Sequence, residues 1–141
     1  MLSLLEIKKA TVNKLEPLGV PIIANDIRSG FDKPAFFVQL MPIGDETDIS
    51  ISTSTVTINI HYFSKEKTEI ENLKMLDKLK KIFINKLEVE DRVLTLYEKR
   101  YDIDDNVLQF KFDIRYTESA YVDPEDEIIY EDGSDFEFGF N

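Results

Sequence analysis

The residues of this chain that could do chemistry are few, and their spacing assembles no reactive group. His61 carries the only imidazole. The residues that share its side of an expected strand are Thr57 and Asn59, not the serine, cysteine or paired carboxylates with which a histidine acts as a general base. We therefore interpret His61 as an ordinary strand histidine and predict that the protein is not an enzyme.

Acidic and glycine residues give no stronger signal for a bound ion or cofactor. Asp102, Asp104 and Asp105 lack the regular alternation, the following glycine and the distal glutamate of a calcium loop, so a solvated turn is the better interpretation. Gly30 leads into no helix and belongs to no glycine-rich phosphate loop; its expected role is backbone freedom before a bulky aromatic residue. The sequence therefore predicts no metal and no cofactor.

The negative charge of the chain is concentrated near its C-terminus. Nine of the 28 acidic residues lie in residues 118–141, which contain no lysine or arginine, whereas the other 19 are balanced by 17 basic residues. We expect a nearly neutral domain, residues 1–117, followed by an acidic tail, residues 118–141. An acidic chain is poorly suited to gripping nucleic-acid phosphates, so DNA binding is not expected as a primary role.

Further composition features point to a cytoplasmic place of assembly. The chain has no cysteine, which excludes disulfides and fits a reducing compartment. No apolar stretch approaches the roughly 18 residues of a membrane span, and the N-terminus lacks the basic and apolar segments of a signal peptide. We expect a soluble protein that is not exported and does not enter a membrane.

Two capping pairs mark the expected helices. Ser3 with Glu6 predicts a helix that ends before Pro17, and Thr68 with Glu71 predicts one that runs to about residue 85. Helical spacing predicts that the first helix buries one apolar side and the second another; the residues are Leu4, Leu5, Ile7, Val12 and Leu15 in the first, and Leu73, Leu76, Leu79 and Phe83 in the second.

Extended runs separate and follow these helices, and they predict the fold class. They lie at about residues 22–24, 35–41, 56–63, 92–101 and 107–116. The last is the clearest half-buried strand, because five apolar residues alternate with polar ones: Leu108, Phe110, Phe112, Ile114 and Tyr116. We predict an α+β fold in the order α-β-β-β-α-β-β, with a mainly antiparallel sheet of four to five strands and both helices packed on one face.

The segment of residues 42–55 is harder to interpret. Pro42 and Gly44 predict an acidic loop after the second run. Ile49 and Ile51 have odd numbers, whereas the apolar residues of the next run have even ones, so we expect a bulge, bend or break between residues 52 and 55. Two interpretations stay open: a mobile loop in the isolated subunit, or a low-charge surface for a partner.

The acidic tail also has two interpretations. Repelling carboxylates and few apolar residues favour disorder in the free protein. The tail nevertheless contains a small apolar cluster at residues 128–130 and a strict alternation of Phe136, Phe138 and Phe140. Such a segment could add a strand to the exposed sheet edge of a neighbour, with the alternate aromatic side chains giving the fit.

Particular residues give the chain a family resemblance. Residues 30–40 read GFDKPAFFVQL, and residues 56–63 read VTINIHYF and precede a helix rich in lysine and glutamate. This pattern resembles the phage tail terminator family, in the branch of contractile-tail phages and defective prophages. The resemblance continues through Arg100 and Tyr101 to the strand of residues 107–116, so it covers about residues 1–117 and leaves out the acidic tail.

The resemblance implies a structural role in the virion, without catalytic residues or a cofactor. Proteins of this kind form a homo-oligomeric, six-membered ring at the head-proximal end of the tail. The ring caps the tail tube, ends tube and sheath polymerisation, and presents a surface to the head-side connector or adaptor. DNA passes through the lumen without specific binding. We expect the contacts to include two residue sets: Asp45, Glu46, Ile49, Ile51, Ser52 and Thr53, and the tail residues Phe136, Phe138 and Phe140.

Two other functions compete with this one. Another head-tail joining protein, such as a head-completion or adaptor protein, would also be structural but would bind on the portal side. An acidic protein-binding module, for instance one that mimics DNA, would be a stable monomer with its charge spread over one folded face. The concentration of acidic residues in the tail argues against that module.

Overall fold

The computed structural model describes residues 2–23 and 30–119. The described residues fall into two compact units. We call residues 2–23, 30–44 and 54–116 the body, and residues 45–53 with 117–119 the tip unit. Each unit is described by itself.

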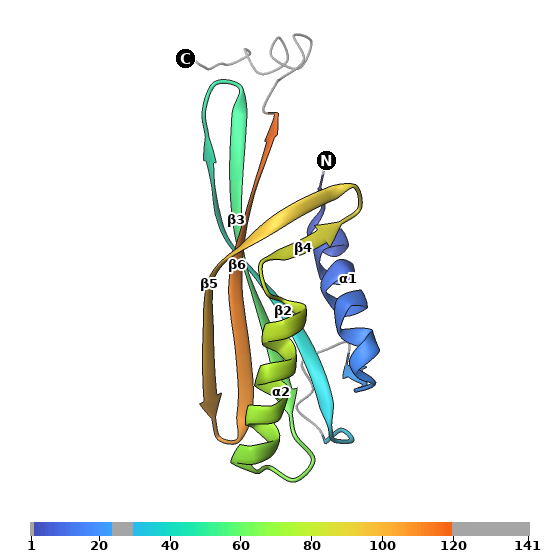
Figure 1. Cartoon of the computed structure of the whole chain (residues 1–141). Coiled ribbons are helices and arrows are strands. Elements are labelled where there is room, and N and C mark those ends of the chain that lie inside the picture. The colour runs from blue at the N-terminus through green and yellow to red at the C-terminus, as the bar shows by residue number, and fades with distance from the viewer. Residues whose placement is uncertain (1, 24–29, 120–141) are drawn as a thin grey trace. The chain divides into compact units, whose positions relative to one another are not determined.

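Six strands form one sheet in the order β1-β2-β3-β6-β5-β4 (Figure 1). Strand β1 is parallel to β2, whereas β4, β5 and β6 form antiparallel pairs, so the sheet is mixed. The prediction of two helices and an α+β fold is confirmed, but the predicted four to five mainly antiparallel strands are too few. The strands are β1 (Ile22–Ile23), β2 (Ala35–Thr47), β3 (Ile51–Phe63), β4 (Lys86–Val89), β5 (Arg92–Asp104) and β6 (Val107–Ser119).

Helix α1 (Leu4–Leu15) begins with the predicted capping box. Ser3 Oγ accepts a hydrogen bond from the Glu6 N–H at 3.1 Å, and Glu6 Oε1 accepts one from the Ser3 N–H at 2.9 Å. A 3-10 turn, η1 (Glu16–Leu18), follows, and Gly19 ends it with a φ of 73°. Glycine is the residue that adopts this left-handed backbone most readily, so the predicted helix ends in the expected way.

Helix α2 (Glu69–Ile82) has only half of its predicted capping box. Thr68 Oγ1 accepts a hydrogen bond from the Glu71 N–H at 3.2 Å. Instead of returning to the cap, the Glu71 carboxylate accepts hydrogen bonds from the N–H groups of Lys65 and Glu66, at 3.0 and 2.9 Å, and from the Tyr62 hydroxyl at 3.0 Å. Glu71 therefore fastens the loop after β3 to the start of α2.

These bonds set the ionisation of both side chains. Burial and the hydrogen bond to the charged Glu71 raise the pKa of Tyr62 to about 12. Burial alone would raise the pKa of Glu71, but the bonds from Glu66, Lys65 and Tyr62, with the positive charge of Lys65, outweigh it and lower that pKa. The Glu71 carboxylate is therefore ionised in the folded protein at neutral pH.

One hydrophobic core joins both helices to the same face of the sheet. The five apolar side chains predicted for β6 are all buried, as expected. The predicted helix sides are only partly right, because Leu5 is 80% exposed and Leu4 and Leu73 are also exposed. The other predicted side chains are buried or pack against the core: Ile7, Val12 and Leu15 of the first helix, and Leu76, Leu79 and Phe83 of the second. The prediction missed Thr11 in α1 and Asn72 and Met75 in α2, which are also buried.

The sheet curls because β5 bends (Figure 1). The pairing of β5 with β6 shifts register between Tyr97 and Arg100, and Glu98 has a φ of 49° at that β-bulge. The turn to β6 is tighter than predicted: Asp105 and Asn106 have φ of 53° and 64°, the left-handed pair of a two-residue hairpin turn.

The loop predicted from Pro42 and Gly44 is wrong. Strand β2 continues through both residues to Thr47, and β3 starts at Ile51 and runs without a break to Phe63. Ile49 lies in the turn between them, so its odd number does not belong to the strand alternation. The φ of Gly30 is not in the left-handed region, and an added Cβ atom would meet nothing within 4 Å. The backbone freedom expected at this glycine is therefore not used.

Replacing Phe110 by alanine tests the core. Phe110 is fully buried and packs against the rings of Phe83, Phe112 and Tyr101, at 5.2 to 6.0 Å between centroids. We expect Phe110→Ala to lower the free energy of unfolding by about 3–5 kcal/mol. Urea denaturation measures the loss. The control is Ile70→Ala, at a side chain that is 66% exposed, where a loss as large as that of Phe110→Ala would contradict the packing described.

Replacing Glu71 by glutamine tests the loop contact through its pH dependence. The folded pKa of Glu71 lies below the unfolded value, so its ionised form adds stability above the unfolded pKa of about 4.3, and this stability is lost as the pH falls through the folded pKa. We expect Glu71→Gln to cost about 1–2 kcal/mol at pH 7 and progressively less in acid. The matched control is Glu69→Gln in the same helical turn; equal losses for both variants at every pH would contradict the role of Glu71.

Candidate interaction surfaces

The sheet face opposite the helices carries polar side chains that are held together across strands. The even-numbered residues from 56 to 62 in β3 and from 108 to 116 in β6 are in the core, so the odd-numbered residues between them lie on this second face. Thr57 and Asn59 lie there and are only 5% and 3% exposed. Buried polar groups need partners, and neighbouring strands supply them.

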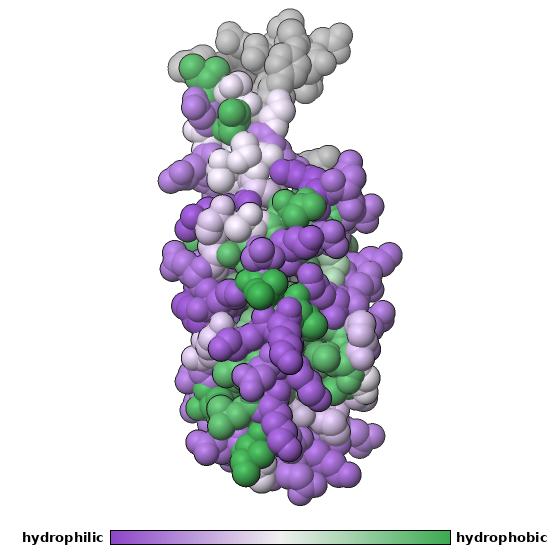
Figure 2. Space-filling view, in the orientation of Figure 1, coloured by the Kyte–Doolittle hydropathy of each residue, from purple (hydrophilic) through white to green (hydrophobic). Residues whose placement is uncertain are grey.

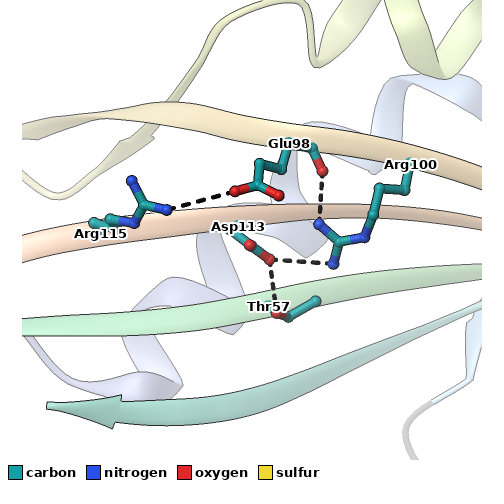
Figure 3. A network of polar contacts seen from close by, with 5 residues as sticks. All are labelled: Thr57, Glu98, Arg100, Asp113 and Arg115. Atoms are coloured by element: carbon teal, nitrogen blue, oxygen red, sulfur yellow. Dashed lines mark hydrogen bonds and ion pairs between the residues drawn. The ribbon is translucent and has the colours of Figure 1, made fainter.

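An ion-pair network on this face holds the β5 bulge in place (Figure 3). The Arg100 guanidinium donates to the Glu98 carbonyl oxygen at 2.8 Å and to Asp113 Oδ1 at 3.3 Å. Thr57 Oγ1 donates to the same Asp113 oxygen at 2.7 Å, and Arg115 pairs with the Glu98 carboxylate at 3.7 Å. Three strands are therefore joined at the point where β5 changes register.

Further polar contacts continue along β3. Asn59 Nδ2 donates to Gln109 Oε1 at 3.2 Å. His61 Nε2 lies 3.1 Å from Gln39 Oε1, and its ring lies 5.5 Å from that of Phe37. His61 therefore joins β3 to β2, as an ordinary strand histidine does. Sequence reasoning found the residues of this face from their alternation, but not their partners.

In the described residues, the polar side chains of this face serve contacts between strands. Across residues 2–23 and 30–119, no group of three or more histidine, aspartate or glutamate side chains is placed to hold a metal ion. The side chains instead satisfy one another, with Asp113 accepting from two donors. Such an arrangement keeps a surface in a fixed shape, which is what a lasting protein contact needs.

The tip unit brings together six of the predicted contact residues. Asp45, Glu46, Ile49, Ile51, Ser52 and Thr53 all fall within its Asp45–Thr53 segment. Because this segment is a hairpin end rather than a loop, its side chains are held in defined positions. The other predicted contacts, Phe136, Phe138 and Phe140, lie outside the described residues.

Hydroxyl groups tie the tip unit together. Thr47 and Ser52 contact each other across the hairpin at 3.3 Å, and Thr53 contacts Thr117 of β6 at 3.3 Å. The Asp48 N–H donates to the Ile51 carbonyl oxygen at 2.7 Å, which closes the turn. The hydroxyl contacts join β2 to β3 and β3 to β6 within the tip unit, while Ile49 and Ile51 are exposed.

Exposed apolar side chains mark the end of the hairpin. Ile49 is 95% exposed and Ile51 46%, and Figure 2 shows apolar residues at this end of the hairpin, beside hydrophilic ones. A side chain as exposed as that of Ile49 contributes almost no buried apolar area to the stability of its own chain. It is therefore available for contact with another protein.

A double-mutant cycle on Arg100 and Asp113 tests the network. Asp113 is the less exposed partner, at 15% of its side chain, so part of the coupling escapes solvent screening. We expect a coupling energy of about 1 kcal/mol from alanine substitutions, measured by urea denaturation. The control cycle uses Lys86 and Glu88, a pair 3.9 Å apart and exposed at both ends, where the coupling should be near zero. Equal couplings would contradict the cross-strand role of Arg100.

Comparison with known proteins identifies the family. No helix in the part of the chain that the structure describes is long and apolar enough to cross a membrane. No curated protein matches the chain. The model of the family described as phage tail terminator protein matches residues 6–127, which is most of the chain. This is the family that residues 30–40 and 56–63 predicted, and its members are structural components of phage tails. The chain belongs to the phage tail terminator family.

Proposed function

We propose that the protein forms the six-membered ring that the sequence resemblance implies, and that this ring caps the finished tail tube. The ring ends tube and sheath polymerisation and offers its other side to the head-side connector, at the head-proximal end of the tail. The observation that carries this proposal is the family match over residues 6–127.

Termination requires contacts that close on themselves. A subunit with two different lateral surfaces forms a ring when the rotation between copies closes, and the finished ring has no lateral surface left for another copy. The ring must then keep its shape against the tube. The cross-strand contacts of Thr57, Arg100 and Asp113 make each subunit stiff enough for that.

The tip unit is our candidate for contact with the tube or a neighbouring subunit. Ile49 and Ile51 provide exposed apolar area, and the hydroxyls of Thr47, Ser52 and Thr53 already contact hydroxyl partners, which lowers the cost of desolvating them. Asp45 and Glu46 lie next to this apolar end and are both exposed. Their charges would select among partners by complementarity.

The charge distribution supports a passive passage for DNA. Residues 1–117 are nearly balanced and residues 118–141 are acidic, so the protein lacks the excess of cations that grips phosphates. We propose that DNA crosses the lumen of the ring without specific binding.

We also propose that residues 1–117 form the structural domain and residues 118–141 a separate acidic tail. The ring has a structural role and does no catalysis.

Tail length measures the proposed role of the tip unit. We expect Ile49→Asp to leave the fold intact and to weaken tube capping by about tenfold or more, since burying an exposed isoleucine is worth about 1.5–3 kcal/mol. Electron microscopy of particles made with this variant should show overlong tubes. The matched control is Ile70→Asp on α2, also an exposed isoleucine, which should give tails of normal length.

Two outcomes would count against these assignments. Normal tail lengths with Ile49→Asp, and with a charge-reversed Asp45→Lys and Glu46→Lys variant, would remove the tip unit from the tube contact. Particles that lack the protein altogether test the function itself: overlong tubes indicate a terminator, whereas tubes of normal length that fail to join heads indicate an adaptor.

A further inference from the structure

Apolar side chains are exposed where the end of β5 lies beside α2. They belong to Leu73 of α2 and to Tyr101 and Ile103 of β5, and we call these three residues the β5-end patch. Tyr101 pairs with Phe110, and Ile103 pairs with Leu108. Both partners are buried in the core that the helices cover, so Tyr101 and Ile103 lie on the helix side of the sheet.

A cation on α2 shows that the two elements of this patch are neighbours. The Lys80 ammonium lies 5.7 Å from the centre of the Tyr101 ring. Lys80 follows Leu73 by about two helical turns, so both lie on the same side of α2. Figure 2 shows apolar residues among hydrophilic ones over the part of the body where α2 and the last residues of β5 lie in Figure 1. Leu73 therefore lies on the side of α2 that faces β5.

Negative charge surrounds the β5-end patch. Asp77 of α2 is exposed one helical turn after the leucine of the patch, and Asp102, Asp104 and Asp105 are exposed at the end of β5 and in the turn that follows. An exposed apolar patch with a polar rim is typical of a surface that binds another protein. These acids favour a partner that carries basic residues beside an apolar side chain.

Helix α1 carries a surface of that kind. Residues 7–14 contain three lysines and no acidic residue. Leu5 and Lys9 are exposed one helical turn apart, and Lys8 lies beside them, three residues after Leu5. We call Leu5, Lys8 and Lys9 the α1 stripe. It places an apolar side chain next to two positive charges, which complements the β5-end patch.

The two surfaces suit a contact between copies of the chain. Figure 1 shows α1 on one side of α2 and the last residues of β5 on the other, so the surfaces are different parts of the body. Each has charges of mostly one sign, which disfavours the pairing of either surface with itself. A ring is built from such a pair of different lateral surfaces.

We propose that the α1 stripe of one copy packs against the β5-end patch of the next copy around the ring. Leu5 covers the apolar side chains of the patch, and Lys8 and Lys9 face its aspartates. This inference rests on the proposed function. It assigns the lateral contacts to the body and leaves the tip unit to meet the tube.

Two charge-reversed variants of the full-length chain test the contact. The first carries Lys8→Glu and Lys9→Glu, and the second carries Asp77→Lys and Asp104→Lys. Either variant alone brings like charges together, so we expect it to need at least about tenfold more protein than the native chain to form rings. Sedimentation velocity measures the fraction of rings. In an equal mixture the two chains can alternate around a six-membered ring with opposite charges at every contact, so rings should return.

The control is a chain with Lys74→Glu and Lys78→Glu, which replace two exposed lysines of α2 and should leave ring formation unchanged. Circular dichroism checks the fold of each variant. Rings formed by either charge-reversed chain as readily as by the native chain would overturn the inference. So would two folded variants that form no rings when they are mixed.

An apolar variant keeps the test decisive if a charge reversal disturbs the fold. Leu5→Ser changes a side chain that is exposed, and it should also raise the concentration needed for rings. Val93→Ser, at another exposed apolar side chain of the body, should not. Equal ring formation by both serine variants would overturn the inference.

Electron microscopy of tubes assembled with the same samples keeps the two proposals apart. Charge-reversed chains that still form rings and cap tubes overturn this inference and leave the proposed function standing. Rings that return in the mixture but leave the tubes overlong support the inference and count against the proposed function. A native chain that never forms rings overturns both.

Discussion

The alternation of side chains along β6 is the constraint on which the rest of the structure depends. Its even-numbered residues from 108 to 116 are buried in the core that both helices share, and its odd-numbered residues provide Gln109 and Asp113 to the opposite face. A shift of one residue would exchange the two faces. Because β6 lies between β3 and β5, this one register fixes the helix layer, the polar face and the position of the β5 bulge.

Local rules predicted the parts of the fold that depend on neighbours in sequence. The Ser3 cap and the alternation of β6 follow from contacts within a few residues, and both were predicted. Strand β4 was missed, because its four residues include two charged ones and only pairing with β5 makes it a strand. The continuation of β2 through Pro42 was missed because proline is depleted in strands and usually indicates a turn, and only the pairing of β2 with β3 shows that the strand continues.

The candidate surfaces were predictable to different degrees. Residues 42–55 were recognised as a candidate surface from Ile49, Ile51 and the run of serine and threonine, but as a loop, since the hairpin depends on pairing between β2 and β3. The polar network was not recognised, because Thr57 and Asp113 are 56 positions apart and no local pattern joins them. The orientation of α1 about its axis was predicted only in part. The side with Ile7 and Leu15 faces the core, and Val12 lines a pocket between α1, β1 and β2.

Strands at the ends of a sheet are a liability in a free monomer, because their unpaired N–H and C=O groups invite pairing with another strand. In the part of the chain that the structure describes, the two end strands are β1, of two residues, and β4, of four. Short length and charged side chains such as Lys86 and Glu88 of β4 are common ways of blocking such pairing. Association of copies of the chain would then depend on side-chain surfaces such as the exposed isoleucines of the tip unit. In the proposed ring, lateral contacts that close on themselves would leave no such surface free to recruit further subunits.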